Sequence, residues 1–382
     1  MSTLSPESLL QPRAVDGDAP QPDPAPRPAG RGGAGREGSG KRVGIREIAQ
    51  RAEVSTATVS MVLNQNPKIT EATRQRVLRV IHELDYRPNR QAQALSSKYT
   101  RMLGVLMPTL RHAVADPYFG EVLSGIVDRA AKRGHKVMLE NVRPDFIKTR
   151  QHIELFERRY VDGVFCVGFA NRVPFLRDLV DGGYAAIAVN SVFDEFEVDH
   201  VVCDYRGGAE QVMTCLTQLG HSQIGLIHGS PDVATQRMIM EVFAERTGCG
   251  GKAGPSACMV DGLFTERGGA DAAKELLERQ PNLTAIFAGN DKMALGALHY
   301  AQHEGIKVPD DLSIVGFDDI PHTAFVTPAL TTIHTPLYEV GALSADRLIE
   351  RIRGKTGPVK EVLPTHLVLR ESTSIAQPAR PS

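Results

Sequence analysis

The sequence has no apolar run of the roughly 20 residues that a helix needs to cross a bilayer, so we expect no membrane span. Its first residues also lack the apolar core of a secretory signal, which favours a cytoplasmic protein. The five cysteines are odd in number and include no Cys-x-x-Cys pair, which argues against a disulfide framework and a zinc site. Cys249 and Cys258 could pair within one loop, but we expect reduced, unpaired thiols.

Catalytic motifs are also missing. There is no Ser/His/Asp motif, no His-Glu-x-x-His, and no Gly-x-Gly-x-x-Gly at the first strand-to-helix unit. Residues 248–253 resemble a phosphate-binding loop only faintly, because the spacing is wrong and no Ser or Thr follows Lys252. We therefore expect a protein that is not an enzyme and that holds no cofactor and no metal.

Charge is unevenly spread, although the formal net charge is only −1. Residues 41–101 contain twelve Lys or Arg against five Asp or Glu, whereas residues 102–382 contain 28 against 35. A basic segment on an acidic body is typical of a protein with a nucleic-acid-binding head.

The two ends of the chain are predicted to be tails, at residues 1–42 and 377–382. The first 40 residues hold seven Pro and seven Gly with little apolar content. Such a composition cannot bury enough surface to offset the entropy lost on ordering, so we expect the N-terminal segment to be disordered.

A helix-turn-helix pattern occupies residues 45–64. The apolar residues of its first half recur at helical spacing, and a break at Glu53 and Val54 separates them from a second helix that Ser55 can cap. The outward side chains early in the second helix are small enough to enter a major groove. An ordinary helical hairpin in a small bundle is the alternative. The outward residues are Thr56, Ala57, Ser60 and Met61.

A third helix is predicted over residues 71–84, capped by Thr70. Its apolar stripe, which includes Val77 and Val80, should close a small core with Ile48 and Val59. We assign residues 43–87 to this head.

From residue 102 the pattern changes to apolar runs that alternate with amphipathic helical stretches. Such alternation predicts parallel sheets with helices on both faces, and about 280 residues of it fit two similar subdomains around a cleft. Ligands of such folds bind at the carboxyl ends of the strands. The predicted strands are 103–107, 137–139, 164–167, 186–189, 201–203, 224–227, 285–288 and 314–317, and helices are predicted at 119–132, 209–219 and 293–303.

Ordered short motifs run through both parts of the chain. In the head they are Val54-Ser55, Thr58-Val59-Ser60, Val62-Leu63-Asn64 and Tyr86-Arg87-Pro88-Asn89-Arg90, followed by Ala92 and Leu95; in the core they are the stretches 288–296, 315–319 and 330–333. Together these motifs resemble the lactose-repressor (LacI/GalR-type) family of bacterial transcription regulators.

The resemblance implies a small all-α helix-turn-helix head with a hinge helix, joined to a two-subdomain α/β core like that of periplasmic binding proteins. It further implies a DNA-binding transcriptional regulator, in the first place a repressor, whose operator affinity is controlled by a small ligand such as a sugar. The expected partners are double-stranded DNA with a pseudo-palindromic operator, a carbohydrate effector and a second copy of the chain. An activator, or a sugar-binding protein with the same core and no DNA role, is the alternative.

For DNA, the resemblance implies phosphate contacts that set the register and side chains that read the bases. Ala57 and Met61 offer only apolar contact, which suits thymine methyls, whereas the family often has Arg at the position of Met61. Glu53 stands where the family has a turn glycine, and Gly44 replaces a capping Thr or Ser. The matched positions are Ser55, Thr58 and Thr70 for phosphates, and Thr56, Ala57 and Met61 for readout.

Residues 88–100 match the hinge of the family. Asn89 can cap a helix that is too short to be stable alone, and the family's hinge folds when two copies meet in a minor groove. Leu95 matches the leucine that wedges between base steps, and Ala92 lets the two helices approach. Packing of Leu95 on the core, as a linker residue, is the alternative.

The resemblance also places an effector site in the core, which we assign to residues 101–376. Aromatic rings would stack on the ligand or wall the site, and polar side chains would hydrogen-bond its hydroxyls. Each position has a plainer alternative: a helix cap for Asn290, core packing for Phe264, a surface ion pair for Arg237 and a loop acid for Asp318. The matched positions are Tyr118, Phe119, Asn190, Arg237, Phe264, Asn290 and Asp318.

Overall fold

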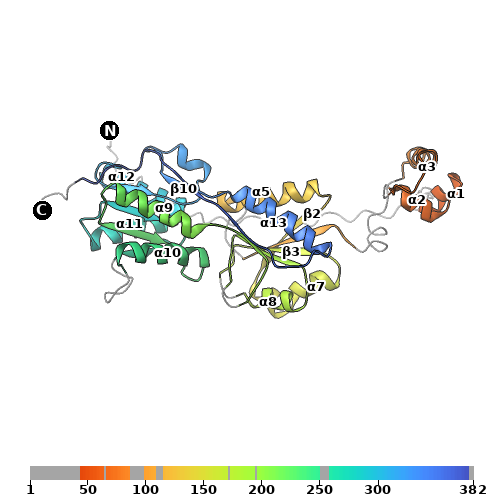
Figure 1. Ribbon diagram of the computed structural model, residues 1–382, viewed down its shortest axis with the longest axis horizontal. Coiled ribbons are helices and arrows are strands. Elements are labelled where there is room, and N and C mark those ends of the chain that lie inside the picture. The colour runs from red at the N-terminus through yellow and green to blue at the C-terminus, as the bar shows by residue number, and fades with distance from the viewer. Residues whose placement is uncertain are drawn as a thin grey trace, which may run out of the picture. The chain divides into compact units, whose positions relative to one another are not determined.

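The computed structural model describes residues 44–63, 66–86, 99–108, 115–170, 173–193, 196–249 and 258–377. The chain divides into two compact units, Met1–Arg90 and Gln91–Ser382 (Figure 1). The predicted tail 1–42 and the hinge positions Asn89, Ala92 and Leu95 lie outside the described residues. The domain boundaries that we assigned from the sequence stay predictions.

The described part of the first unit is a head of three helices, α1 (Ile45–Arg51), α2 (Thr56–Leu63) and α3 (Glu71–Glu83). Both predicted caps are present. Ser55 Oγ accepts the backbone N–H of Thr58 at 3.0 Å, and Thr70 Oγ1 accepts that of Thr73 at 3.4 Å. Each bond satisfies a donor that the first helical turn would otherwise leave without a partner.

The apolar faces of the three helices meet in one small core. Ile48, Val59 and Val77 are fully buried there, and Val80 is nearly so. The sequence prediction that the third helix closes the helix-turn-helix core is therefore confirmed.

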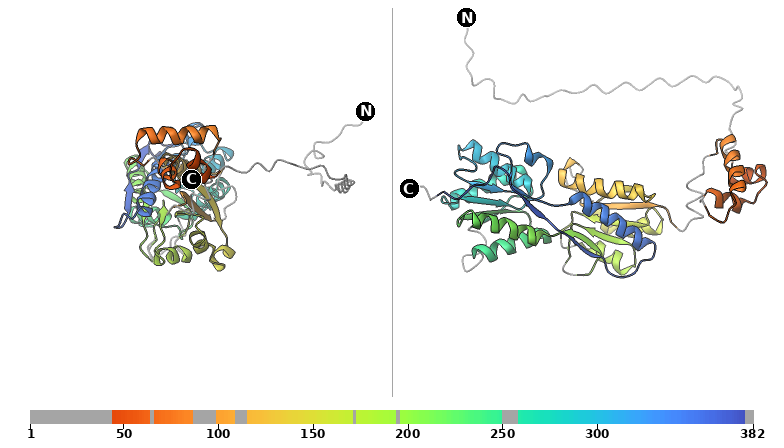
Figure 2. Two further views of the ribbon diagram at one scale, coloured as in Figure 1. Left: turned by 90° about the vertical axis from the view of Figure 1, so that its right-hand side faces the viewer. Right: turned by 45° about the horizontal axis from the view of Figure 1, so that its top comes forward.

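The second unit consists of two α/β subdomains (Figures 1 and 2). The N-subdomain has a parallel sheet of strand order β11-β5-β4-β3-β1-β2. Its elements are β1 (Met102–Pro108), α5 (Pro117–Lys132), β2 (Lys136–Val142), α6 (Pro144–Lys148), α7 (Gln151–Glu157), β3 (Gly163–Val167), α8 (Pro174–Asp181), β4 (Ala186–Val189), β5 (His200–Cys203), α13 (Leu337–Ile352) and β11 (Lys360–Leu363).

The C-subdomain has a parallel sheet of order β7-β6-β8-β9 and an antiparallel pair, β10 with β12. Its elements are α9 (Tyr205–Gln218), β6 (Ile224–His228), α10 (Ala234–Thr247), β7 (Met259–Asp261), α11 (Glu266–Arg279), β8 (Ala285–Ala288), α12 (Asp291–His303), β9 (Ser313–Val315), η3 (Pro321–Ala324), β10 (Thr332–His334) and β12 (His366–Val368). The chain passes between the subdomains after β5, between β10 and α13, and between β11 and β12.

Each predicted strand coincides with or overlaps an observed one, which confirms the predicted parallel sheets with covering helices. The buried strands carry near-continuous apolar runs because both of their faces are covered. Two glycines let helices pack closely in the N-subdomain: a Cβ at Gly125 of α5 or at Gly341 of α13 would collide with the backbone of the other helix. None of the described helices combines the length and apolar character needed to cross a membrane.

The cysteines differ from expectation at one pair. The structure joins Cys249, after α10, to Cys258, before β7, so the expectation of unpaired thiols is wrong there. Cys166 and Cys203 are buried free thiols, and Cys215 is a half-buried one. The two cysteines lie at consecutive elements of one subdomain, which brings their sulfurs together. The spacing of the cysteines in the sequence did not indicate whether the pair forms.

Candidate functional sites

The first turn of α2 presents polar and small side chains to solvent. Ser55, Thr56 and Ala57 are exposed, and Met61, one turn later, is half-buried. The opposite side of the helix is anchored by Val59 and Val62 in the head core. A helix that is fixed on one side and carries short side chains on the other can enter a major groove and reach base edges.

The turn before α2 is strained at a residue that the sequence had already singled out. Glu53 adopts φ of +51°, in the left-handed region where glycine is favoured. The family glycine that Glu53 replaces would fit this conformation without steric cost. The turn keeps its shape because Val54 donates its backbone N–H to the Ala49 carbonyl at 3.0 Å.

In the core, Asn190 is the centre of a hydrogen-bonded group that joins the two subdomains. Its Nδ2 donates to the phenol oxygens of Tyr118 at 2.7 Å and of Tyr205 at 2.8 Å. Its Oδ1 accepts the backbone N–H of Cys203 at 3.0 Å. Asn190 follows β4 and Tyr118 opens α5, both in the N-subdomain, whereas Tyr205 begins α9 of the C-subdomain. We call Tyr118, Asn190, Tyr205, Phe317 and Asp318 the inter-subdomain site.

Aromatic packing extends this site toward the C-subdomain. The rings of Tyr205 and Phe317 stack with centroids 5.1 Å apart and planes 9° apart. Burial, followed by the charge of Asp318, raises the pKa of the Tyr118 phenol above its usual value. Burial also raises the pKa of Tyr205. Both phenols therefore stay protonated at neutral pH and can act as hydrogen-bond donors.

Asp318 contributes a buried carboxyl group with an open position. Its side chain is 7% exposed, and Oδ1 has no hydrogen-bond partner within the described protein. Burial, with the neighbouring acids Asp291 and Asp116, raises its pKa well above the ordinary value. A buried polar atom without a partner is costly, and a ligand hydroxyl at this position would remove that cost.

Three of the predicted effector positions have a strained backbone. Asn190, Phe264 and Asp318 adopt φ of 51°, 58° and 112°. Non-glycine residues rarely hold such angles unless the surrounding structure fixes them, and they occur often at binding sites.

The remaining predicted positions have contacts within their own subdomain. The Phe119 ring lies against Gly168 and the Phe264 ring against Gly229, at the carboxyl ends of β3 and β6. Arg237 Nη1 donates to the carbonyl of Pro231 at 3.1 Å, in the loop that follows β6. Asn290 Oδ1 accepts the backbone N–H of Met293 at 2.9 Å, so Asn290 caps α12, which is the alternative role that the sequence analysis named for it. Their roles toward a ligand stay predictions.

Several residues of this region were not predicted from the sequence. Tyr205 lies two residues after the predicted strand 201–203, and this place near a strand end was the signal that could have indicated it. Gln236 joins the ends of β6 and β8, because its Oε1 accepts from Gly229 N–H at 2.9 Å and its Nε2 donates to the Gly289 carbonyl at 3.0 Å. Asp291 lies within the family motif 288–296 and is fully buried.

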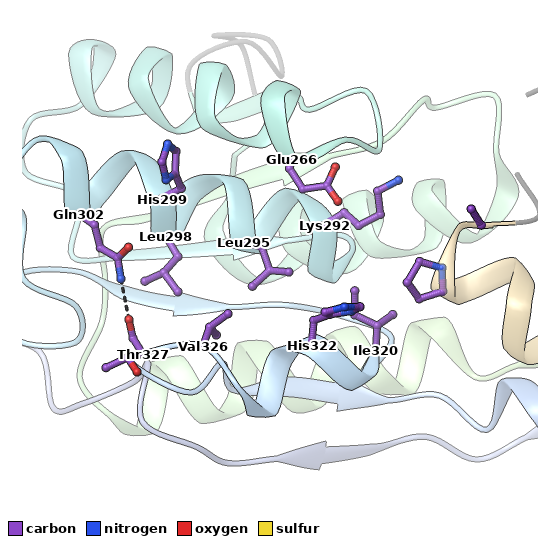
Figure 3. A pocket seen from close by; sticks show the side chains of 12 residues that line it. Glu266, Lys292, Leu295, Leu298, His299, Gln302, Ile320, His322, Val326 and Thr327 are labelled. Carbon is purple, nitrogen blue, oxygen red and sulfur yellow. Dashed lines mark hydrogen bonds between the residues drawn. The ribbon is translucent and has the colours of Figure 1, made fainter. Parts of the chain in front are cut away.

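A separate cavity of about 580 Å³ lies beside α12 and η3, near the start of α5 (Figure 3). Its apolar lining comes from Leu295 and Leu298 of α12 and from Val326, and Gln302 donates to the Thr327 carbonyl at 2.6 Å across one end. Next to it, Phe325 is 87% exposed. Among the described residues, no group of three or more His, Cys, Asp or Glu is arranged to hold a metal ion.

Comparison with known proteins identifies both parts of the chain. Residues 44–89 match the family described as bacterial regulatory proteins, lacI family, and residues 214–373 match the periplasmic binding protein-like domain. The HTH-type transcriptional repressor CytR of Escherichia coli (strain K12) is 31% identical over 333 residues, which cover 86% of this chain and 96% of the relative.

Solved structures give the same result. The lac repressor dimer bound to operator and the anti-inducer ONPF is 26% identical with a TM-score of 0.76, over 87% of this chain and 100% of that one. The transcriptional regulator CelR in complex with cellobiose is 29% identical with a TM-score of 0.66, over the same shares. With its helix-turn-helix head and periplasmic-binding-protein-like core, the chain belongs to the lacI family of bacterial regulatory proteins.

Proposed function

We propose that this protein is a transcriptional repressor whose hold on its operator is set by a small polyhydroxylated ligand in the inter-subdomain site. Membership of the lacI family supports the regulatory half of the proposal. The single observation that carries the ligand half is Asp318 Oδ1, which is buried at the junction of the subdomains without a hydrogen-bond partner in the described protein.

On the DNA side, the exposed turn of α2 enters the major groove. Thr56, Ala57 and Met61 read bases, while Ser55 and Thr58 contact phosphates, together with Thr70 at the start of α3. Residues 88–100 act as the hinge, where Asn89 caps a short helix and Leu95 and Ala92 lie at the minor groove.

On the ligand side, the inter-subdomain site supplies rings and hydrogen-bonding groups in the combination that sugars and nucleosides require. Tyr118 and Phe119 flank the ligand from the N-subdomain, and Phe264 and Arg237 approach from the C-subdomain. Asn190, Asp318 and the amide of Asn290 bond its hydroxyls. The cellobiose complex of a related regulator supports a carbohydrate.

The partner in solution is a second copy of the chain. Two apolar surfaces are unusually exposed: one at α12 and η3 with Phe325, and one at α5 and β2, where Val127 is 45% and Leu139 49% exposed. The dimeric state of the related lac repressor supports a pair of copies, and we place their contact at these faces because of their exposed apolar side chains. Such a dimer would place two heads on the half-sites of a pseudo-palindrome.

Regulation rather than catalysis is the proposed role, because the related proteins are named as regulators. A regulator of bacterial transcription acts at the chromosome, so we place the protein in the cytoplasm, associated with the nucleoid.

The test is footprinting of the purified protein on the DNA upstream of its own gene, repeated with a panel of sugars and nucleosides. A protected pseudo-palindrome that one ligand releases is the expected result. Asp318→Asn should abolish release and leave protection without ligand unchanged. Failure to protect DNA at any ionic strength would contradict repression, and protection accompanied by increased transcription would establish an activator instead.

A further inference from the structure

A second contact joins the two subdomains beside the inter-subdomain site. Lys292 Nζ of α12 lies 2.8 Å from Asp116 Oδ2, at the cap of α5. These residues stand 176 positions apart in the chain and belong to different subdomains. Their side chains are 22% and 19% exposed, so the pair is more shielded from solvent than the surface ion pairs of the same core, such as Arg206 with Glu245.

Asp116 makes a second bond that connects the ion pair to the site. Its Oδ1 accepts the backbone N–H of Tyr118 at 3.0 Å and so fixes the first turn of α5. The Tyr118 phenol oxygen in turn accepts from Asn190. One carboxylate therefore holds both the opposite subdomain, through Lys292, and the helix turn that places Tyr118.

From this geometry we propose that Asp116 and Lys292 are positioning residues that latch the two subdomains together and set Tyr118 against Asn190. The inference depends on the proposed function, because it names a regulatory element of the same ligand site. The latch favours the closed arrangement whether or not a ligand is bound, so it sets how much of the protein is ready to hold one.

The latch acts against an opposing effect at Asp318. Asp318 belongs to the C-subdomain and Asp116 to the N-subdomain, so their interaction crosses the junction, and it is repulsive. Lys292 neutralises Asp116 at the same junction. The Asp116–Lys292 pair therefore favours the closed state. A ligand that accepts or donates a hydrogen bond at Asp318 Oδ1 favours the same state through a separate contact.

The experiment is amide hydrogen exchange on the full-length protein without ligand, which needs neither the effector nor DNA. The reporter is the buried backbone amide of Cys203. It donates its N–H to Asn190 Oδ1, and this bond involves neither latch residue. Asp116→Asn keeps the helix cap and removes the charge, Lys292→Met keeps the apolar stem, and Lys292→Arg keeps the charge. Glu245→Gln breaks an ion pair within the C-subdomain and is the matched control.

Asp116→Asn and Lys292→Met should each speed exchange at Cys203 about five-fold, the population shift expected of one partly shielded ion pair. The double variant should match either single one, while Lys292→Arg and Glu245→Gln should match the wild type. The amide of Ile314, bonded to Ser372 within the C-subdomain, should not change.

Several outcomes would overturn the proposal. They are unchanged exchange at Cys203, multiplied effects in the double variant, or equal acceleration at Ile314, which reports general destabilisation. Because operator protection and ligand release are measured separately, the latch can fail while the proposed function holds, and the reverse is also possible.

Discussion

Asp291 accepts the hydroxyl of Thr332 at 2.6 Å on Oδ1, and this contact ties the start of α12 to β10 inside the C-subdomain. The other oxygen, Oδ2, accepts the backbone N–H of Ile320 at 2.8 Å, before η3. The side chain is fully buried, and burial raises its pKa from 3.8 to about 7 despite these two bonds. A carboxyl group that keeps its proton well above the usual pH range of an acid thus joins three segments around the site.

This carboxyl should make stability depend on pH. Its folded pKa is raised above the unfolded one, so its contribution is full below about pH 4 and is lost as the pH rises through about 7. Asp291→Asn should remove that loss, which is on the order of a few kcal/mol between pH 4 and 8. Urea unfolding at pH 5 and pH 8 measures it. Asp271→Asn, at an exposed acid of α11, should leave the pH dependence as it is, and an unchanged dependence in Asp291→Asn would refute the assignment.

The turn before α2 gives a prediction in which a substitution stabilises the folded head. Glu53→Gly should relieve a left-handed conformation that costs a non-glycine residue roughly 1–2 kcal/mol. Because glycine loses more backbone entropy on folding, the net gain should be about 0.5–1 kcal/mol. Exchange of the Val54 amide, which bonds to Ala49, should slow accordingly. Gln50→Gly, inside α1, should instead speed that exchange, since glycine in a helix costs about 1 kcal/mol.

The sequence predicted those parts of the structure that depend on nearby residues. The caps at Ser55 and Thr70 follow from a few neighbouring positions, and the strands follow from buried apolar runs. The cap at Asn290, which the sequence offered as an alternative to ligand binding, also follows from its position before a helix. Local patterns of this kind are set by backbone geometry and need no knowledge of the rest of the fold.

Contacts between distant segments could not be predicted in this way. Nothing near Asp116 in the sequence indicates that Lys292 faces it, because the pairing depends on how two sheets approach each other. The contact of Tyr205 could not be predicted either, because only the assembled subdomains show that its hydroxyl accepts a hydrogen bond from Asn190. The resemblance to a family indicated positions for the site. It did not indicate contacts made by residues outside those positions, such as Tyr205 and Lys292.

Base readout gives a prediction for α2. Met61→Arg should add a bidentate donor to the exposed side of the helix and favour guanine at the contacted base pair by about 1–3 kcal/mol. Binding to a set of operator variants at one fixed salt concentration would show the changed preference. Thr70→Ala is the control, because loss of a phosphate contact should weaken all variants by a similar factor. A Met61→Arg protein with unchanged preference would remove Met61 from the readout positions.

The exposed ring of Phe325 allows the proposed dimer to be tested. At 87% exposure it lies beside the apolar cavity of α12 and η3, so Phe325→Asp should place a charge where two copies meet. Sedimentation should show a monomer at concentrations where the wild type is a dimer, and operator affinity should fall at least ten-fold because the two heads no longer bind as one unit. Ile375→Asp introduces the same charge at a residue that is 71% exposed but lies near the C-terminal tail, and it should leave both measurements unchanged. If both variants stayed dimeric, the interface would have to lie on another face, and the α5 and β2 surface around Val127 would be the next to test.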